Sequence, residues 1–444
     1  MTEIVLTDIT LSTPRPGGRE TSKVSIKRVA AASFVGTLIE FYDFGIYGFA
    51  AALVFGKIFF PALGTAAATV AAFATFGVAF VARPVGALVF GHFGDRLGRK
   101  KTLVLTLIMM GIATVLVGFM PTTAQIGIAA PICLVILRIV QGLAAGGEWA
   151  GAVLFASESA PQSQRGFWSM FASLGAGVAV ALAPATFLLS GAFMSNEAFL
   201  DWGWRIPFLS SLVLLIVGMW VRLSMEETPV FKAAAESGGI VSIPFADAFR
   251  SQYKEILLAG GMMILTFSFG YLGVAYLTNY GVSVLQLPRT FVLSMSIAAG
   301  CVYTVGILCS GLLSDWVGRR TVVLAAAVLG VAWSLALFSV VLVSGAGQAA
   351  YAVGVVGTLF VSGIALGPMS AYVSELFETR YRYTAVGFAY NIAGIVGGAI
   401  TPILAASVTA QYGGPALGYL LAGLALISLI CALCLRETRG RALD

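Results

Sequence analysis

Five ionisable side chains lie inside long apolar stretches of this chain. The acids are Glu40, Asp43 and Glu148, and the bases are Arg83 and Arg138. A charge placed in the middle of a bilayer costs about 2.5 to 3.5 kcal/mol on insertion scales, so such residues usually mark function. All five fall in the first half of the sequence. We therefore expect proton chemistry to be concentrated in that half.

Asp43 and Arg138 have the spacing of a coupling pair. Asp43 lies about 14 residues into the first apolar stretch and Arg138 about 11 residues into the fourth, which would run in the opposite direction. Both side chains would then sit at a similar depth and could form an ion pair. Protonating the carboxylate would release the arginine, so one proton could be exchanged for a rearranged salt bridge. The alternative is a static pair that staples two helices together.

Two further acids are candidates for proton coupling. Glu40 lies three residues before Asp43 and therefore on nearly the same face of a helix. Because two acids this close titrate as a pair, either of them could carry the proton. Glu148 follows Gly146 and Gly147. It could line an inner cavity or, as a structural residue, bond helix ends.

Arg83 and Gln141 are candidates for contact with a substrate. Arg83 has no acid within its own apolar stretch. It could bind the carboxylate of an anionic substrate, or pair with Glu40 or Glu148 as a packing element. Gln141 follows Arg138 by about one helical turn, where its amide could hydrogen-bond a ligand. Arg138 itself is a second candidate for binding the substrate.

The second half of the chain offers only polar and aromatic side chains inside its apolar stretches. Such residues suit the wall of a cavity, so we expect this half to shape and gate a substrate site. Beyond the arginines and Gln141, the side chains that we expect at the substrate are Tyr42, Tyr47, Tyr276, Asn279, Tyr303 and Asn391.

A glycine-flanked charged turn occurs twice in the chain. Residues 91–101 read GHFGDRLGRKK, and residues 311–320 read GLLSDWVGRR, about half the chain later. Such a repeat indicates two copies of one membrane unit. The expected gating residues of the two copies are Asp95, Arg96, Arg99, Asp315 and Arg319.

The acid of each copy could hold one side of the molecule shut. Asp95 could pair with an arginine of a neighbouring helix or face the positive N-terminus of the eleventh helix near Arg382. The alternative is a topology anchor made of snorkelling cations. Trp316 stands where the first copy has Arg96, so we expect the second latch to be weaker.

A second repeated feature, an acid and an arginine after corresponding apolar stretches, supports the duplication. Glu158 and Arg165 follow the fourth apolar stretch, as Glu375 and Arg382 follow the tenth. We expect these four residues to take part in gating as well.

Composition excludes an ordinary soluble globule. Hydrophobic residues make up 59% of the chain and charged residues 10%, with a mean hydropathy of +0.95, whereas charged residues normally account for about a quarter. A membrane span needs roughly 20 apolar residues. We expect twelve spans, at about 29–56, 67–93, 102–120, 127–157, 167–191, 203–222, 256–280, 291–313, 321–343, 349–373, 384–409 and 415–435.

The positive charges indicate the orientation. With a cytoplasmic N-terminus, most of the 26 Lys and Arg residues fall on the cytoplasmic side, as the positive-inside rule requires. The pI of about 9.1 then reflects membrane topology and not nucleic-acid binding. The expected organisation is a cytoplasmic N-terminal tail (1–28), a six-helix bundle (29–222), a cytoplasmic linker (223–255), a second six-helix bundle (256–435) and a short cytoplasmic C-terminal tail (436–444).

The chain resembles the major facilitator superfamily over essentially its whole length. The resemblance rests on the duplicated turn, on Arg138-x-x-Gln141-Gly142, and on Glu158 with Arg165. Four further blocks resemble the metabolite:proton symporter family, the bacterial carriers of shikimate, 2-oxoglutarate, citrate, and proline or betaine. They are EFYDF (40–44), GGEW (146–149), WGWRIPF (202–208) and ETPVF (227–231). Proton-coupled sugar porters of the superfamily pair a helix-one aspartate with a helix-four arginine, which implies a coupling role for Asp43 and Arg138.

The resemblance implies an all-α membrane protein with the major facilitator fold, in which twelve transmembrane helices form two pseudo-symmetric six-helix bundles. It also implies a proton-coupled symporter that imports a small organic acid by alternating access across a bacterial plasma (inner) membrane. The expected partners are the acid, protons and the lipid bilayer, and we expect a functional monomer. No cofactor, metal ion or nucleic acid is expected, and the proton gradient would supply the energy. Nothing in the sequence suggests an enzyme, because it has no nucleotide-binding loop or nucleophile constellation.

Two other functions remain open. A zwitterion carrier for proline or betaine would share the same motifs. A drug or metabolite efflux antiporter is the less favoured alternative, because the fifth stretch lacks the Gly-Pro-rich signature of drug/proton antiporters.

Overall fold

The structure is a computed structural model that describes residues 26–97, 99–224, 245–343, 347–379 and 381–441. Side chains are described for these residues except 91–100, 224 and 245–248. The expected gating residues Asp95, Arg96 and Arg99 therefore lie outside the described side chains.

Twelve helical segments of the described chain are long and apolar enough to cross a membrane. A spanning backbone in lipid must satisfy its own hydrogen bonds, so a long apolar stretch folds as helix. The all-α fold with twelve expected spans is confirmed. The first half comprises α1 (Ile26–Ala50), η1 (Ala51–Phe55), α2 (Gly56–Phe59), η2 (Pro61–Leu63), α3 (Gly64–Leu97), α4 (Arg99–Gly118), α5 (Thr123–Ile126), α6 (Ala129–Ala145), α7 (Glu148–Ser159), η3 (Gln162–Gln164), α8 (Arg165–Gly191), α9 (Asn196–Asp201), η4 (Gly203–Arg205) and α10 (Ile206–Ser224).

The second half begins, in the described chain, with α12. Its elements are α12 (Phe245–Tyr271), η5 (Leu272–Tyr276), α13 (Leu277–Asn279), η6 (Tyr280–Val284), α14 (Arg289–Val317), α15 (Arg319–Ala336), η7 (Leu337–Val341), α16 (Gln348–Leu366), α17 (Met369–Leu376), α18 (Arg382–Ala393), η8 (Gly394–Ile400), α19 (Thr401–Tyr412) and α20 (Gly414–Cys434).

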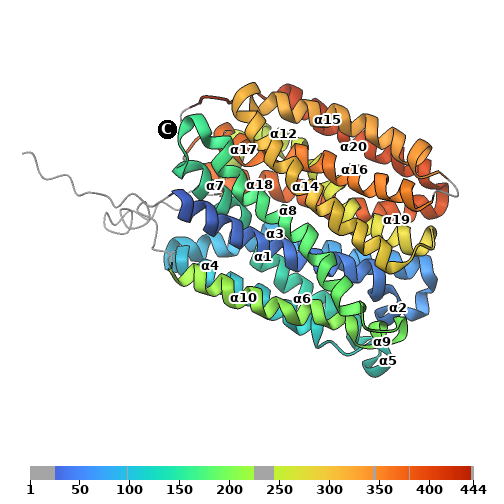
Figure 1. Ribbon diagram of the computed structural model, residues 1–444. Coiled ribbons are helices and arrows are strands. Elements are labelled where there is room, and N and C mark those ends of the chain that lie inside the picture. The colour runs from blue at the N-terminus through green and yellow to red at the C-terminus, as the bar shows by residue number, and fades with distance from the viewer. Residues whose placement is uncertain (1–25, 98, 225–244, 344–346, 380, 442–444) are drawn as a thin grey trace, which may run out of the picture.

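The helices form two bundles, one from each half of the chain (Figure 1). In the first bundle α1 packs on α8 and α3 on α6, and in the second α12 packs on α18 and α14 on α16. The bundles meet where α8 lies along α14 and where α3 contacts α18 and η8. The start of α1 and the C-terminal end of the chain lie on the same side of the molecule (Figure 1). We call this side the terminal end and the opposite side the distal end.

One membrane-crossing segment in each bundle is broken at a corresponding place. In the first bundle α6 ends and α7 begins around Gly146-Gly147, and in the second α16 ends and α17 begins around Gly367-Pro368. A break frees backbone carbonyl groups, which then need partners from neighbouring helices. Both breaks lie next to the seam between the bundles, since α7 contacts α17 and α18, and α17 also contacts α8.

Candidate functional site

A buried ion pair lies in the middle of the first bundle. Arg83 on α3 donates from Nη2 to Oε1 of Glu40 on α1 over 2.9 Å, and the two side chains are 1% and 0% exposed. The guanidinium lies over three aromatic rings, with its carbon 4.1 Å from the Phe44 centroid, 4.9 Å from that of Phe80 and 5.7 Å from that of Tyr390. Of the two partners that the sequence left open for Arg83, the structure selects Glu40.

Arg83 also reaches the second bundle. Its Nη1 is 3.5 Å from the hydroxyl oxygen of Tyr390 on α18, a long hydrogen bond. The Tyr390 ring stacks on Trp149 of α7, with centroids 4.0 Å apart and an interplanar angle of 15°. Tyr390 therefore contacts both the buried arginine and the first-bundle helix that follows the break. Tyr390 is one of the aromatic residues in the apolar stretches of the second half, but it was not among the expected substrate contacts, since nothing in the sequence distinguishes it from other wall residues.

Asp43 is linked to Arg138 through two intermediate side chains and not directly. Arg138 Nη1 donates to Gln141 Oε1 over 2.9 Å, Gln141 Nε2 donates to Thr114 Oγ1 over 2.7 Å, and Thr114 Oγ1 donates to Asp43 Oδ2 over 2.8 Å. The direct Asp43–Arg138 ion pair expected from the sequence is absent from the described side chains. The expectation failed because helix depth constrains only the level of a residue, whereas helix rotation decides which side chain it meets.

Thr114 is a functional candidate that the sequence did not reveal. Its hydroxyl has one proton, and two acceptors lie within reach, Asp43 Oδ2 at 2.8 Å and the Met110 carbonyl oxygen at 2.9 Å. The proton can therefore point to the carboxylate or turn back to the helix. A threonine surrounded by apolar residues on α4 carries no sequence signal for this role.

Arg138 is enclosed by aromatic rings and backbone. Its guanidinium carbon is 4.0 Å from the Tyr47 ring centroid and 4.8 Å from that of Phe44, and Nη2 donates to the Phe76 carbonyl over 3.1 Å. The side chain is fully buried. Cation–π contacts of this kind stabilise a desolvated guanidinium by roughly 2 kcal/mol. Arg138 is therefore held as a cation without an acid in direct contact among the described residues.

A second buried ion pair joins Glu148 on α7 to Arg222 on α10. Glu148 is 3% exposed, and its Oε2 has no hydrogen-bond partner among the described residues. Arg222 ends the sixth expected span, so the positive-inside rule counts it with the cytoplasmic charges. The structure instead turns this side chain inward, where it is 13% exposed. The position of Arg222 at the end of a span does not show from the sequence that its side chain points inward.

The expected substrate-contacting tyrosines of α1 bond within the first bundle. Tyr42 lies 3.1 Å from Ser210 Oγ and 3.2 Å from Thr186 Oγ1, hydroxyl to hydroxyl. Tyr47 donates to Thr75 Oγ1 over 2.8 Å. Both hydroxyl groups thus have partners in their own bundle.

Two of the expected residues of the second bundle cross the seam. Asn279 Nδ2 donates to the Ala52 carbonyl over 3.0 Å, and Asn391 Nδ2 lies 3.5 Å from the Gly146 carbonyl oxygen. Tyr276 and Tyr303 are buried inside the second bundle. The structure therefore brings Asn391 and the unexpected Tyr390 to the central cluster.

A network of charges joins the bundles at the terminal end. Glu375 on α17 pairs with Arg165 on α8 over 3.0 Å and with Arg319 over 3.3 Å, and Arg319 pairs with Asp315 over 2.8 Å. Asp315 also accepts hydrogen bonds of 2.9 Å from the amides of Gly166 and Phe167 at the N-terminus of α8. The second copy of the charged turn was expected to be the weaker latch. Asp315 thus bonds to two backbone amides across the seam and to Arg319 within its own bundle. The comparison with the first latch concerns Asp95, whose side chain lies outside the described ones.

The remaining gating residues form a separate pair. Arg382 Nη1 lies 3.3 Å from Glu158 Oε1, and Glu158 is half exposed while Arg382 is buried. The expected contact between Asp95 and the region of Arg382 concerns a side chain that the structure does not describe. Arg382 itself bonds across the seam, since α7 and α18 belong to different bundles.

The segment after α20 is bound to this network. Thr438 Oγ1 donates to Glu375 Oε2 over 2.7 Å, and Glu437 Oε1 accepts from the Arg319 amide over 2.9 Å. Arg165 Nη1 donates to the Arg441 carbonyl over 2.9 Å. The described part of the expected C-terminal tail is therefore part of the closed terminal end.

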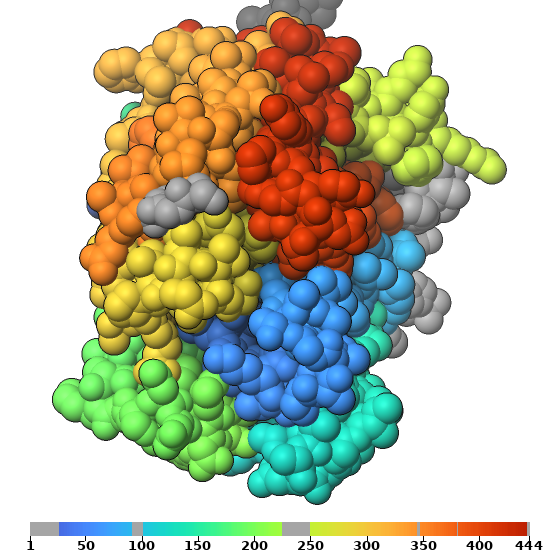
Figure 2. All heavy atoms as spheres, turned by 90° about the vertical axis from the view of Figure 1, so that its right-hand side faces the viewer, coloured from blue at the N-terminus to red at the C-terminus, as the bar shows by residue number. Residues whose placement is uncertain are grey.

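The bundles also touch at the distal end. Besides the Asn279–Ala52 bond, a Cβ atom placed on Gly48 of α1 would lie 3.6 Å from Val274 and 3.7 Å from Ala275 of η5. Figure 2 shows this end, where atoms of the first half meet those of the second. Contacts at both ends enclose the central cluster, which is the arrangement expected of a closed form.

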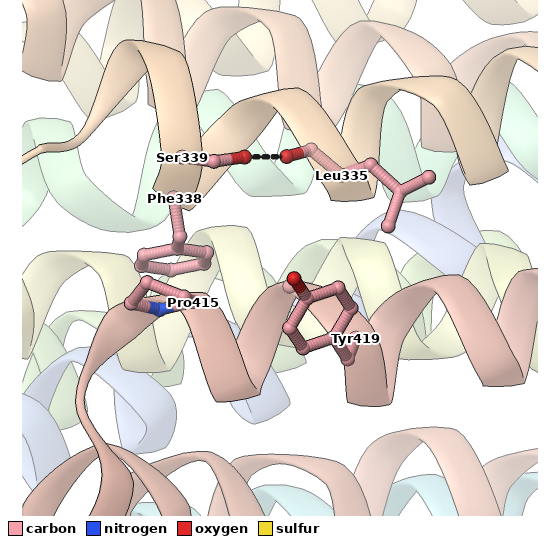
Figure 3. A pocket seen from close by; sticks show the side chains of 6 residues that line it. Leu335, Phe338, Ser339, Pro415 and Tyr419 are labelled. Carbon is pink, nitrogen blue, oxygen red and sulfur yellow. Dashed lines mark hydrogen bonds between the residues drawn. The ribbon is translucent and has the colours of Figure 1, made fainter.

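A depression elsewhere on the molecule is a weaker candidate. It lies between α15 with η7 and the start of α20 (Figure 3), and its lining residues are Leu335, Phe338, Ser339, Pro415, Gly418 and Tyr419. This lining contains no carboxylate, amine or guanidinium. Among the described residues, no group of three or more His, Cys, Asp and Glu side chains could hold a metal ion.

Comparison with known protein sequences gives matches along almost the whole chain. The model of the family described as "Sugar (and other) transporter" matches residues 29–238 and 242–444. The inner membrane metabolite transport protein YhjE of Escherichia coli is 42% identical over 94% of this chain and 96% of its own length. The shikimate transporter of Escherichia coli is 37% identical, covering 97% and 99%. The proline/betaine transporter of Salmonella typhimurium is 32% identical, covering 94% and 85%.

Solved structures share the fold at low sequence identity. The xylose transporter XylE of Escherichia coli in a partially occluded inward-open conformation superposes with a TM-score of 0.72 at 16% identity, covering 94% of this chain and 99% of that one. The proton:xylose symporter XylE bound to 6-bromo-6-deoxy-D-glucose gives a TM-score of 0.73 at 17% identity, covering 94% and 97%.

Proposed function

Because this chain belongs to the sugar (and other) transporter family of the major facilitator superfamily, we propose that it imports a small organic acid together with a proton. It is a membrane transporter of metabolites and not an enzyme. The resemblance drawn from the sequence motifs is thereby confirmed at the level of the superfamily. Support for an acid comes from the 37% identical shikimate transporter. Support for proton coupling comes from the charges inside the first bundle.

The observation that carries the proposal is the balance of those charges. Three acids and three arginines share the interior, and their formal charges cancel: Glu40, Asp43, Glu148, Arg83, Arg138 and Arg222. Protonation of one acid leaves one positive charge without a counter-ion, and a monocarboxylate supplies the matching negative charge. Because a net charge in a dry interior is costly, the proton and the carboxylate bind better together than either does alone. We expect one proton to enter with each monocarboxylate.

The Asp43–Thr114–Gln141–Arg138 chain provides a means of coupling. An ionised Asp43 accepts a hydrogen bond from Thr114. Thr114 in turn accepts from Gln141, and Gln141 accepts from Arg138. A protonated Asp43 can donate to Thr114, whose own proton then turns to the Met110 carbonyl. The proton on Asp43 thus reverses the hydrogen bond between Asp43 and Thr114, the residue to which Gln141 donates. Protonation of Glu40, which would release Arg83, remains the parallel proposal.

Arg83 is the proposed contact for the substrate carboxylate. Its Nε has no hydrogen-bond partner among the described residues, although the side chain is buried. A guanidinium can bind a carboxylate through two parallel hydrogen bonds. Arg83 also touches Tyr390 of the second bundle, so a ligand at this position would contact both halves.

Uptake of a zwitterion is the second candidate. The 32% identical relative is a proline/betaine transporter, and aromatic cages bind quaternary ammonium groups. Here the cage formed by Phe44, Phe80 and Tyr390 encloses Arg83. A cage filled by the protein's own cation favours an anionic substrate. A zwitterion also brings no net charge to match the proton.

We further propose that the protein works in a bacterial inner membrane with both termini in the cytoplasm, as a monomer and without a cofactor. The 26 Lys and Arg residues support this orientation through the positive-inside rule. The terminal end is then cytoplasmic, and the distal end faces outward.

The test is a pH measurement outside lightly buffered, de-energised cells that express the protein. Shikimate, 2-oxoglutarate, citrate, benzoate and proline are added in turn. Alkalinisation with one acid, lost in Asp43→Asn or in Glu40→Gln, supports symport and identifies the carrier acid. If no acid changes the external pH although the protein is present in the membrane, the proposal is contradicted. A pH change with proline alone favours the zwitterion carrier.

A further inference from the structure

Glu148 stands on a turn that the second bundle covers. The break between α6 and α7 leaves the carbonyls of Gly146 and Gly147 just before it. Tyr383 donates to the Gly147 carbonyl over 2.9 Å, and Asn391 lies 3.5 Å from the Gly146 carbonyl. Both side chains come from α18. The surroundings of Glu148 therefore change when the bundles part at the terminal end.

The Glu148–Arg222 pair lies against α1, one turn from Glu40. Gly36 precedes Glu40 by four residues and shares its helix face. A Cβ atom on Gly36 would lie 3.2 Å from Arg222 Nη2 and 3.9 Å from Glu148 Oε1. The glycine thus leaves room for the pair beside α1. Two buried ion pairs follow each other along one side of this helix, Glu40–Arg83 towards the middle of the membrane and Glu148–Arg222 towards the terminal end.

Buried oxygen atoms without partners follow the same face. Glu40 Oε2, Thr37 Oγ1 and Glu148 Oε2 have no hydrogen-bond partner among the described residues. Buried polar atoms are nearly always bonded, so such a row calls for a water, a proton or a ligand. Ser33, one turn before Thr37, donates to the Ala152 carbonyl of α7 over 3.2 Å. The polar row therefore runs from Glu40 back to Ser33, towards the start of α1.

We propose that Glu148 relays the proton from the acids in the middle of the membrane to water at the terminal end. This inference rests on the proposed symport and adds the exit route. In the relay, the O–H bond of protonated Glu40 breaks and an O–H bond forms at Glu148 Oε2, directly or through one water molecule. The charged groups around the acceptor are Arg222 on α10, the Glu40–Arg83 pair and Asp43 on α1. The arginines keep their charges throughout. Withdrawal of α18 then opens Glu148 to water, which accepts the proton.

The relay gives the two ion pairs different tasks. Glu40 and Asp43 respond to substrate, whereas Glu148 responds to the position of the second bundle. Tyr383 and Asn391 cover the Glu148 turn in this closed form, so the relay ties proton release to opening of the terminal end. The competing explanation is a static pair that staples α7 to α10.

The experiment separates these explanations in proteoliposomes with labelled shikimate, or with whichever acid of the panel above the unaltered protein takes up. It compares uphill uptake driven by an imposed pH gradient with exchange of labelled for unlabelled acid, which requires no net proton release. In Glu148→Gln we expect the driven uptake to fall at least tenfold and exchange to stay within about threefold. Glu197→Gln changes an exposed glutamate on α9 and serves as the matched control without effect.

The double variant Glu148→Gln with Arg222→Gln guards against a simple loss of pairing. It removes both charges, so no unpaired ion is left inside. If the pair only staples α7 to α10, driven uptake should largely recover in the double variant, and that recovery would overturn the relay. Continued loss of driven uptake with exchange intact supports it. If the unaltered protein exchanges the acid but shows no proton-driven uptake, the proposed symport itself fails, and that result precedes any variant.

Discussion

The broken helix of the first bundle and that of the second share a scaffold but not a chemistry. Each carries two glycines four residues apart at the break: Gly142 lies in α6 with Gly146 directly after it, and Gly363 lies in α16 with Gly367 directly after it. A Cβ atom on Gly146 would lie 2.2 Å from the Arg83 carbonyl oxygen of α3, and one on Gly367 would lie 2.5 Å from the carbonyl oxygen of Ile307 on α14. Both helices therefore pack on their neighbours through bare backbone.

The difference begins at the first residue after each break. Glu148 starts α7, whereas Met369 starts α17. The neighbouring helices differ in the same way, since α1 and α3 supply Glu40, Asp43 and Arg83 to the interior of the first bundle. Both copies thus share the packing of the break, and under the proposed symport the proton chemistry belongs to the first copy only.

Alanine at Gly146 or Gly367 should disrupt the helix packing that the two bundles share, and this loss of stability is the largest effect that we expect. The added methyl group of Gly146→Ala or Gly367→Ala would meet backbone atoms that cannot rotate away. Overpacking of this kind costs about 1–3 kcal/mol or more. We expect little folded protein in the membrane and a clearly lower thermal unfolding temperature in detergent for both variants.

Gly423→Ala on α20 is the control, because a Cβ atom there meets nothing within 4 Å. It should fold like the unaltered chain. Normal stability of Gly367→Ala beside an unstable Gly146→Ala would show that the two breaks do not share one packing role.

Arg83→Gln should abolish transport while leaving the second bundle's scaffold intact. The change removes the proposed carboxylate contact and leaves Glu40 buried without its cation. Removing one partner of a buried pair typically costs about 3–5 kcal/mol. We expect uptake to fall at least a hundredfold, together with a loss of thermal stability.

The double variant Glu40→Gln with Arg83→Gln distinguishes the two consequences. It should recover much of the stability, since no unpaired charge is left, but not the uptake. Recovery of uptake as well would make the pair a structural element and remove Arg83 as the substrate contact.

Glu375→Gln should loosen the terminal end with a smaller effect. Glu375 is bonded to Arg165, Arg319 and Thr438, which come from both bundles and the C-terminal segment. Weakening these bonds should raise the population that is open at this end. The measurement uses a cysteine introduced at Ser173, whose hydroxyl lies 3.0 Å from that of Ser370 across the seam. This cysteine should react several times faster with a thiol reagent in the Glu375→Gln background than in the background that keeps Glu375.

The fold was largely predictable from the sequence, and the site was predictable only in part. Long apolar stretches and the repeated turn determine the number and pairing of spans, because lipid allows few alternatives. The sequence also identified the buried charges, since their cost in lipid makes them conspicuous. It did not identify their partners: Thr114 and Tyr390 are ordinary in composition, and Arg222 was taken for a surface charge. Which side chains meet depends on helix rotation, which a sequence of apolar residues on all sides does not specify.

Tyr390→Phe is the smallest change that tests the contact between the two unlike halves. It removes the 3.5 Å hydrogen bond to Arg83 and keeps the ring that stacks on Trp149. A single long hydrogen bond contributes about 0.5–1 kcal/mol, so we expect a two- to fivefold rise in the KM for the acid with nearly unchanged stability. Tyr390→Leu, which also removes the stack, should have a clearly larger effect. Equal behaviour of the two variants would assign Tyr390 to packing alone, and the charge cluster of the first bundle would then sense substrate without the second bundle's hydroxyl group.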